Sequence, residues 1–473
     1  MKNSKRILAA GLAVLMSMSF AACGEKNDNS ESSSKAKVEV DSTELAKKIE
    51  SLPEGTVLKW MGTYDLNPTK GSDPSVAYSL FTDKGGTIEW TRVANNKKFD
   101  KLGAVVTSGK DIPDIFKYEW LAFPCQALKG FYQPIDELVD FNDDIWKDVK
   151  KTADQFSFGD IHYVAPISFS IGTMMCYNKA IIESEGLDDP MELYDSGEWD
   201  WNSFYDIVSD FKSNASGSDE RYGLSGWFAP QFVQQTGQTM VVKNAETGDF
   251  ESNINNAEIE KAEKFIYDIS KEGLVDTVWY NSASEAFNNN RNLFYNMGIW
   301  AMTGAAAGPT SSDNWGIVPV PSCPNVEGSY MTSDMLAYMW VKGSDNAAAV
   351  KCWFECERVA TFDQEYQKTA KEKFLSDNPN WTEEMYDIYK EASSDKFVQI
   401  FDYGYGISQA ISVDRDEGRG PISDLYEGVT KTDENGQQFT YTQLKEKYSA
   451  LIDSELKTIN DQIKKFLSTQ NNS

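Results

Sequence analysis

Short apolar runs alternate with amphipathic stretches through most of this chain. Runs at 56–62 (TVLKWMG), 87–93 (TIEWTRV) and 112–118 (IPDIFKY) are rich in β-branched and aromatic residues and predict strands. Helical patterns lie between them, over about 74–81 and over 99–109, which ends on a glycine. Strands that alternate with helices in this way predict an α/β fold with largely parallel sheets.

The clearest helical pattern covers 198–214 (EWDWNSFYDIVSDFKSN). Its apolar residues recur three and four apart, at Phe204, Ile207, Val208 and Phe211. Asp200 or Asn202 supplies a suitable N-cap. Trp199 and Trp201 open the segment, and we expect both to pack beneath the helix rather than to bind a ligand.

Five further segments are helical by their pattern of apolar positions. Three are long, at 256–273, 346–360 and 441–467, and two are short, at 135–139 and 143–150. No internal repeat is visible along the chain. The sequence therefore predicts a mixed α/β protein rather than a repeat array.

Three basic residues and an uncharged run of sixteen residues open the chain. The basic residues are Lys2, Lys5 and Arg6, and the uncharged run covers 7–22. A basic start, an apolar middle and small residues at the end are typical of a secretory signal peptide. The run is shorter than the roughly 20 residues that a membrane-spanning helix needs. We therefore predict that residues 1–22 are a signal peptide.

A cysteine ends the apolar run. Cys23 follows Ala21-Ala22, and this arrangement resembles a bacterial lipoprotein signal, although Phe20 stands where leucine is usual. The resemblance implies cleavage before Cys23 and attachment of lipid to its sulfur. Residues 23–40 are polar and serine-rich, so we expect a lipid anchor followed by a flexible tether. This predicts an extracytoplasmic protein that is lipid-anchored to the cell membrane.

Length and charge narrow the class of protein further. A chain of 473 residues exceeds the size at which one core stops growing, about 250–300 residues, so we expect two lobes. The formal net charge is −28, which opposes binding to nucleic acid or to an anionic lipid surface. The charge does not exclude a neutral ligand.

Histidine and cysteine usage limits the chemistry of the chain. His162 is the single histidine, so a Ser–His–acid nucleophile set would have to use it, and a transition-metal site would lack a second histidine ligand. Besides Cys23, the cysteines are Cys125, Cys176, Cys323, Cys352 and Cys356. Their odd number and irregular spacing do not form a disulfide framework. We expect Cys352 and Cys356 to be core thiols and expect neither a metal nor another cofactor.

Four stretches together resemble a known family. They are 174–187 (MMCYNKAIIESEGL), 197–208 (GEWDWNSFYDIV), 287–300 (FNNNRNLFYNMGIW) and 315–325 (WGIVPVPSCPN). Their order and spacing resemble the extracellular solute-binding proteins of family 1, the sugar-capturing subunits of bacterial ABC importers. Asn290 departs from the pattern where glycine is usual, and Phe294 departs where a small residue is common.

The resemblance implies a two-lobe, periplasmic-binding-protein-like fold of type II, with a ligand cleft between lobes joined by a hinge. We expect lobe 1 to hold 41–166 plus 316–360, and lobe 2 to hold 167–315 plus 361–473. The implied ligand is a carbohydrate, which we expect to be an oligosaccharide because the chain is rich in aromatic residues. The implied partner is a membrane permease of an ABC transporter, and we expect a monomer.

Candidate ligand contacts are aromatic and polar side chains that follow strands or lie in loops. Sugar sites combine aromatic rings, which match the C–H faces of a pyranose, with polar groups that bond its hydroxyls. The candidates are Trp300, Trp227, Tyr64, Asp65, Tyr118, Glu119, Trp120, Gln231, Tyr330, Asp334, Tyr403 and Tyr405. Ser168 and Ser170 lie at the expected first crossing between lobes, and we interpret them as hinge backbone.

Two alternative functions stay open at this point. A secreted glycoside hydrolase needs only two carboxylates at a suitable separation, and the chain has 73 aspartates and glutamates. However, its order of elements does not read as eight regular β/α units. A peptide-binding protein of the same fold is the second alternative. We expect a binding protein that is not an enzyme.

Overall fold

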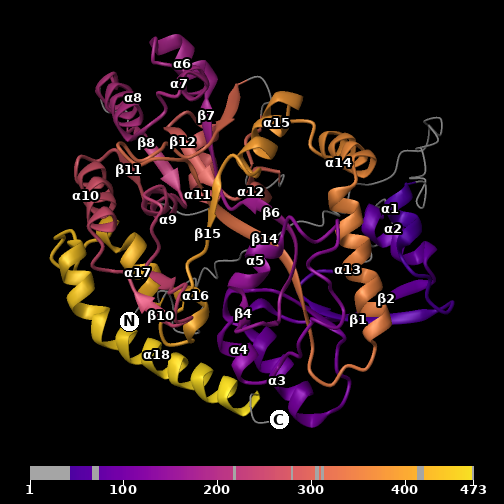
Figure 1. Ribbon diagram of the computed structural model, residues 1–473. Helices are drawn as coiled ribbons and strands as arrows, with labels where there is room; N and C mark the ends of the chain where they lie inside the picture. Colours follow the sequence, from indigo (N-terminus) through magenta and orange to yellow (C-terminus); the bar gives the residue numbers. More distant parts are fainter. Residues whose placement is uncertain are drawn as a thin grey trace, which may run out of the picture.

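Two β-sheets form the framework of the molecule in the computed structural model (Figure 1). The structure describes residues 43–66, 74–216, 220–277, 281–303, 308–310, 314–412 and 420–470. The predicted signal peptide, Cys23 and the predicted tether lie outside these ranges. Across the described ranges, the helices are all too short or too polar to cross a membrane.

The fifteen strands and eighteen α-helices alternate along the chain. The strands are β1 (Thr56–Gly62), β2 (Gly86–Arg92), β3 (Ile115–Lys117), β4 (Ser157–Phe158), β5 (Ile161–His162), β6 (Ala165–Ile171), β7 (Met174–Asn178), β8 (Tyr222–Gly226), β9 (Val241–Lys243), β10 (Phe250–Ser252), β11 (Val275–Asp276), β12 (Asn292–Met297), β13 (Trp315–Val318), β14 (Tyr330–Trp340) and β15 (Val398–Ile400). The α-helices are α1 (Glu44–Lys48), α2 (Val76–Asp83), α3 (Lys98–Ser108), α4 (Cys125–Leu128), α5 (Lys150–Gln155), α6 (Lys179–Glu185), α7 (Pro190–Ser196), α8 (Trp201–Ser213), α9 (Ala229–Gln234), α10 (Ala257–Lys271), α11 (Asn281–Asn288), α12 (Ile299–Met302), α13 (Ala347–Phe362), α14 (Gln364–Asp377), α15 (Glu383–Ala392), α16 (Gly404–Ile407), α17 (Pro421–Glu427) and α18 (Tyr441–Gln470). Short 3₁₀ turns are η1 (Asn95–Lys97), η2 (Trp120–Ala122) and η3 (Gly428–Thr430). These counts refer to the part of the chain that the structure describes.

The first sheet has the order β15-β14-β3-β1-β2, and β6 also pairs with β14. β1 runs parallel to β2 and β3, while β14 runs antiparallel to β3 and β6. Helices α2 and α13 pack together beside this sheet, where the rings of Phe81 and Trp353 meet edge to face at 5.5 Å. All three strands that the sequence predicts in this region are present.

The second sheet has the order β11-β8-β12-β7-β13. β8 runs parallel to β11 and β12, and β7 runs antiparallel to β12 and β13. Helix α8 lies on this sheet, and Asp200 caps it with a full capping box. The predicted apolar face of α8 is buried, and so are Trp199 and Trp201. The prediction that both tryptophans belong to the core is confirmed.

Two long strands connect the sheets. β6 pairs with β14 in the first sheet and leads directly into β7 of the second, and β14 takes the chain back after β13. β13 pairs with β7, so sheet membership changes a few residues beyond the predicted boundary at 315/316. The predicted division of the chain into lobes stays a prediction.

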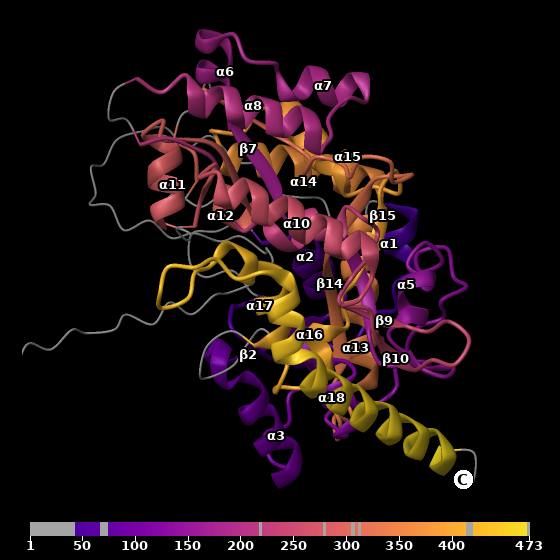
Figure 2. The ribbon, with the colours of Figure 1, turned by 90° about the vertical axis from the view of Figure 1, so that its left-hand side faces the viewer.

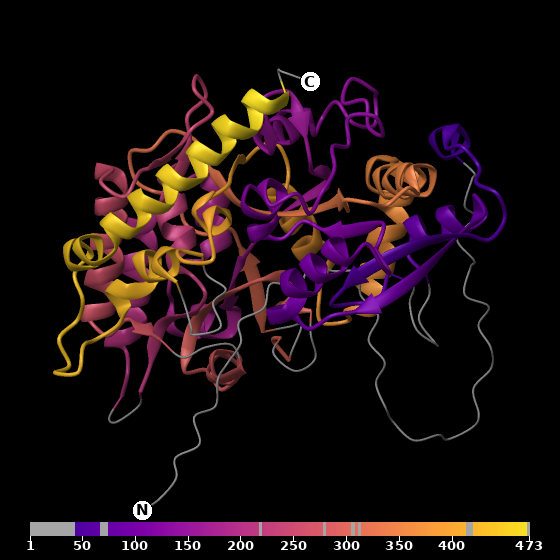
Figure 3. The ribbon, with the colours of Figure 1, turned by 90° about the horizontal axis from the view of Figure 1, so that it is seen from below.

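The C-terminal helix α18 runs along the outside of the molecule (Figures 2 and 3). Near its start, the hydroxyl of Tyr441 donates to the carbonyl of Ile254, at 2.9 Å. Near its end, the ring of Phe466 contacts Phe158 and Tyr163 beside the first sheet, at 5.6 and 6.5 Å between centroids. α18 therefore contacts segments from both halves of the chain.

Two local predictions are wrong, and the prediction that Cys352 and Cys356 are core thiols is confirmed. The segments 135–139 and 143–150 form hydrogen-bonded turns rather than helices, because one or two turns of helix do not offset the cost of nucleation. All five cysteines of the described ranges are buried and free, including Cys352 and Cys356 on α13. The ring of His162 on β5 lies 2.6 and 3.0 Å from carboxylate oxygens of Asp136 and Asp154, so both of its nitrogens have hydrogen-bond partners.

Candidate functional site

The carboxyl ends of parallel strands carry most of the predicted site residues. In the first sheet, Tyr64 and Asp65 follow β1, while Tyr118, Glu119 and Trp120 follow β3. The crevice beyond such strand ends is where α/β sheets bind their ligands. The predicted residues of this sheet therefore lie at a suitable edge.

In the second sheet, two tryptophans follow the carboxyl ends of two parallel strands. Trp227 follows β8 and Trp300 follows β12, its parallel neighbour, and both pack against the same apolar cluster. The N–H of Trp227 donates to the carbonyl of Asn296 at 2.8 Å, and the Asn296 amide donates back to the Trp227 carbonyl. Gly226 has φ +94°, and a Cβ there would overlap the Asn296 carbonyl, so glycine is required. The two hydrogen bonds and the conformation of Gly226 thus fix the backbone position of Trp227.

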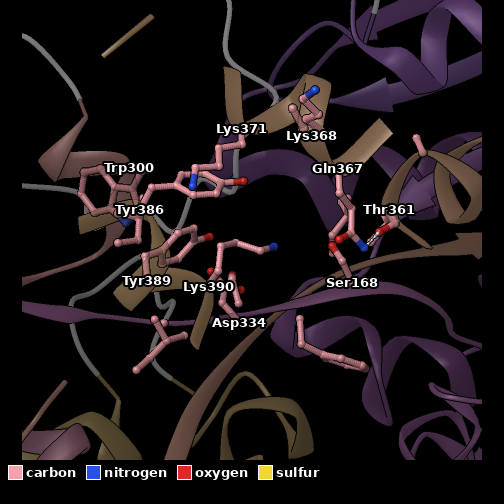
Figure 4. A pocket seen from close by; sticks show the side chains of 18 of the residues that line it. Ser168, Trp300, Asp334, Thr361, Gln367, Lys368, Lys371, Tyr386, Tyr389 and Lys390 are labelled. Atoms are coloured by element: carbon pink, nitrogen blue, oxygen red, sulfur yellow. Dashed lines mark hydrogen bonds between the residues drawn. The ribbon is translucent and has the colours of Figure 1, made fainter. Parts of the chain in front are cut away.

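A cavity of about 520 Å³ opens beside these strand ends (Figure 4). Its walls come from β6 and β14, from α12, from the end of α13, and from α14 and α15. Its polar and aromatic lining residues are Ser168, Phe169, Ser170, Trp300, Asp334, Thr361, Gln364, Gln367, Lys368, Lys371, Tyr386, Tyr389 and Lys390. This volume is typical of a small-molecule site.

Helices α14 and α15 are fixed to the second sheet, and this places their side chains at the cavity. Between them, Trp381 meets Trp315 of β13 edge to face at 5.7 Å and meets Phe374 of α14 at 5.1 Å. At the end of α15, the hydroxyl of Ser393 accepts the N–H of Ile171 at 2.9 Å. The wall that carries Tyr386 and Tyr389 is therefore anchored to the core at both ends.

Asp334 of β14 is the charged residue of the connecting strands that lines the cavity. Burial raises the pKa of its carboxyl to about 6; the Lys117 cation lowers this pKa and the Glu119 carboxylate raises it. Asp334 and Trp300 are the two predicted contact residues that line this cavity. Because its pKa lies near neutrality, we expect Asp334 to accept hydrogen bonds above about pH 6 and to donate one below it.

Tyr64 and Glu119 line a second, much smaller space of about 10 Å³. Lys98 and Lys117 fill its polar side: the Lys98 ammonium lies 3.2 Å from the Glu119 carboxylate, and the Lys117 ammonium lies 5.8 Å from the Tyr64 ring centroid. A space of this size holds about one water molecule. Asp65 lines neither space.

Three predicted aromatic residues from separate segments pack on one another. The rings of Trp120 and Tyr405 stack at 4.7 Å with 22° between planes, and Trp120 lies 6.3 Å from Trp227. Gly406 permits this contact, because a Cβ there would overlap the carbonyls of Trp120 and Phe123. This aromatic group joins a strand end of the first sheet to a strand end of the second.

The remaining predicted residues lie deeper or elsewhere. Tyr118 and Tyr403 pack around Phe156, at 5.2 and 5.9 Å between centroids. Gln231 is 1% exposed. The hydroxyl of Tyr330 donates to its own loop, at the Glu327 carbonyl. Tyr118, Tyr403, Gln231 and Tyr330 do not line the 520 Å³ cavity.

No residue of α14 or α15 is among the predicted ligand contacts. Tyr386, Tyr389 and Lys390 recur three and four residues apart on α15, which was the available signal for one helix face. That spacing does not reveal which face meets a cavity, because the contact depends on how Trp381 packs against the second sheet. Within the described ranges, no group of three or more His, Cys, Asp or Glu side chains is placed to hold a metal ion.

A family model described as bacterial extracellular solute-binding protein matches residues 69–356, more than half of the chain. The chain belongs to this family. A comparison of this solute-binding protein with curated sequences finds no match.

Solved structures share the fold. The GacH receptor of Streptomyces glaucescens, determined unliganded and with acarbose, aligns with a TM-score of 0.57 and 15% identity, over 87% of this chain and 99% of its own. A binding protein from B. animalis subsp. lactis in complex with β-1,6-galactobiose gives 0.57 and 17%, over 86% and 98%. The sugar-binding protein MalE of Xanthomonas citri gives 0.56 and 12%, over 88% and 100%. The two-lobe solute-binding fold expected from the sequence is confirmed.

Proposed function

We propose that this protein captures a saccharide and delivers it to the permease of a bacterial ABC importer. The observation that carries the proposal is the 520 Å³ cavity, in which the rings of Trp300, Tyr386 and Tyr389 lie beside hydroxyl and amide side chains. Rings match the C–H faces of sugars, and polar side chains bond their hydroxyls. The similar solved structures, which were determined with acarbose and with β-1,6-galactobiose, support the same class of ligand.

Binding is proposed to work by closure of the two lobes. The cavity lies where β6 and β14 connect the sheets, so a change at these strands alters its width. The ligand favours the closed state only as far as it binds that state more tightly. Capture and release of this kind need no chemical step, and we propose a monomeric binding protein rather than an enzyme.

The direct test is titration calorimetry of the full chain with a panel of mono- and oligosaccharides, peptides and metal ions. The protein is purified in a detergent without a sugar headgroup. Trp300→Ala should weaken saccharide binding by about 1–3 kcal/mol, which is about five- to 150-fold. Tyr205→Ala on α8 is the control, because Tyr205 does not line the cavity, and it should bind as the parent does. Circular dichroism checks that both variants fold.

The same experiment separates the alternatives. Each sugar is incubated overnight with the protein and analysed for cleavage; cleaved product would favour a glycoside hydrolase. Binding of peptides without any saccharide would retain the fold and overturn the proposed ligand. Unchanged saccharide affinity in folded Trp300→Ala would remove Trp300 from the site.

The lipid anchor is a separate part of the proposal. Cleavage before Cys23 and lipidation of its sulfur would hold the protein at the outer side of the membrane, next to the permease. Cys23→Ser should move the protein from the membrane fraction to the soluble fraction of expressing bacteria. Retention in the membrane fraction would overturn the anchor and leave the ligand proposal intact.

A further inference from the structure

Three lysines converge on one cavity of a strongly acidic protein. The chain has 73 acidic and 45 basic residues, yet Lys368, Lys371 and Lys390 all line the same wall of the 520 Å³ cavity. They come from α14 and α15, and Figure 4 shows the side chain of Lys390 reaching into the space between the tyrosines and Gln367. Whether these lysines can bind an anionic group depends on which of them are already paired with carboxylates of the protein.

Lys371 is already paired. Its ammonium lies 3.1 Å from a carboxylate oxygen of Glu383 and 2.7 Å from one of Asp387, both on α15. These two carboxylates neutralise Lys371 and tie α14 to α15. Lys371 therefore holds the wall together rather than offering a free charge to a ligand.

Lys368 and Lys390 differ from Lys371, because neither has an ion pair or side-chain hydrogen bond within the part of the chain that the structure describes. Lys390 is open to the cavity, and the protein around it withdraws it from water and lowers its pKa, with no carboxylate acting in the opposite direction. A cation in this position gains from an anion that arrives with the ligand.

Of the two carboxylates at the site, Glu119 is paired with a cation, and Asp334 is only influenced by one. Asp334, across the cavity from α15, feels the buried Lys117 cation, and Glu119 lies 3.2 Å from the Lys98 ammonium. Neither carboxylate is paired with Lys368 or Lys390. The two lysines without an ion pair therefore outnumber Asp334, the one carboxylate among the lining residues, and the cavity wall carries a net positive charge.

We propose that the ligand is an anionic saccharide, whose acidic substituent pairs with Lys390 and Lys368 while a sugar ring stacks on Trp300. This inference rests on the proposed function and names its substrate class. The shared chemistry is an anionic group on a sugar: the carboxylate of a uronic acid, or a sulfate or phosphate ester. Both lysines lie beyond residue 356, where the family match ends, so the charge preference is set by a segment of this chain outside that match.

The test uses the full chain and matched ligands in titration calorimetry. The probes are trigalacturonic acid, its methyl ester, oligomers of glucuronate and mannuronate, a sulfated disaccharide, a phosphorylated sugar and neutral maltotriose. At least one acidic probe should bind at least tenfold more tightly than its neutral counterpart. The affinity for that probe should fall as salt is raised, because salt screens the pairing. The uronate, sulfate and phosphate arms distinguish the source of the negative charge.

Variants locate the charge. Lys390→Met should lower the affinity for the acidic probe at least tenfold more than the affinity for neutral maltotriose, whereas Lys390→Arg should retain most of the affinity for the acidic probe. Lys373→Met is the matched control on α14, because Lys373 pairs with Asp377 at 2.8 Å and does not line the cavity. Lys373→Met should bind as the parent does.

Failure of this inference is distinguishable from failure of the proposed function. Neutral saccharides that bind as tightly as acidic ones, with Lys390→Met unchanged, would overturn the anionic ligand and keep the saccharide-binding protein. Binding of acidic peptides without any saccharide would overturn both. Equal losses for acidic and neutral probes in Lys390→Met would assign the residue a packing role and refute charge recognition.

Discussion

Arg358 of α13 is a buried cation that connects three segments, and replacing it should be costly. The side chain is 1% exposed. Its guanidinium donates to the carbonyl of Ile145 at 2.7 Å, to the carbonyl of Ile167 on β6, and to Asp148 at 2.6 Å. Arg358→Met keeps an apolar stem of similar length and removes every donor. Two carbonyls and one carboxylate then lose their partner.

The magnitude follows from the exposure of these partners. Hydrogen bonds to a charged group contribute about 1.5–3 kcal/mol each, and two of them end on carbonyls here. Asp148 is 49% exposed, so water replaces its partner and that pair adds about 0–1 kcal/mol. Arg358→Met should therefore destabilise the protein by about 3–7 kcal/mol, a large part of the roughly 5–15 kcal/mol typical of a folded domain.

Urea unfolding followed by circular dichroism measures this change. Lys351→Met on the same helix is the control, because Lys351 is exposed and lies 3.8 Å from Glu355; it should change stability by less than about 0.5 kcal/mol. Arg358→Lys should fall between the two, since an ammonium cannot reproduce the fork of the guanidinium. A loss below about 1 kcal/mol in Arg358→Met would refute the reasoning, because it would mean that the freed carbonyls find other partners.

Three further predictions concern single residues. Burial raises the pKa of the Glu263 carboxyl, whose oxygens have no hydrogen-bond partner, well above its ordinary value. The stability that the protonated carboxyl contributes is therefore present below its unfolded pKa, near 4.5, and is lost as the pH rises. Glu263→Gln should flatten the decline in the free energy of unfolding between about pH 5 and 7, measured by urea unfolding. An unchanged slope would contradict the buried acid as its source. Burial lowers the pKa of His162, but its hydrogen bonds to Asp136 and Asp154 outweigh burial and raise the pKa above 6.5. The protonated ring therefore stabilises the fold below pH 6.5, and this stabilisation is lost as the pH rises through the raised pKa. His162→Gln should remove the corresponding decline in the free energy of unfolding, and a decline of the same size in the variant would mean that another group causes it. Gly226→Ala should lower the melting temperature more than Gly197→Ala, since both have positive φ but only Gly226 has no room for a Cβ; equal shifts in thermal unfolding would refute the steric argument.

The strands, and the residues that follow them at the sheet edge, could be predicted from short stretches of sequence. Thr56–Gly62 is a strand because its residues favour one, and Tyr64 follows at the sheet edge as a consequence. The family resemblance in 287–300 placed Trp300, which lines the cavity. In these cases the relevant information lies within a few residues of the site.

The contacts that could not be predicted join residues far apart in the sequence, and they depend on how the whole chain packs. Tyr405 stacks on Trp120, and nothing near either residue in the sequence indicates the other. Lys390 lines the cavity because Trp381 packs on Trp315, a contact between distant segments. Helix periodicity predicts that α15 has faces, but the packing of the whole chain selects which face meets the ligand.

The helix α18 also affects the order in which the molecule can be completed. Synthesis proceeds from the N-terminus, so Phe158 and Tyr163 leave the ribosome long before Phe466, the ring that covers them. At about 5–20 residues per second, that surface waits many seconds for its partner. A chain cut short before α18 would therefore leave the rings of Phe158 and Tyr163 without their contact to Phe466.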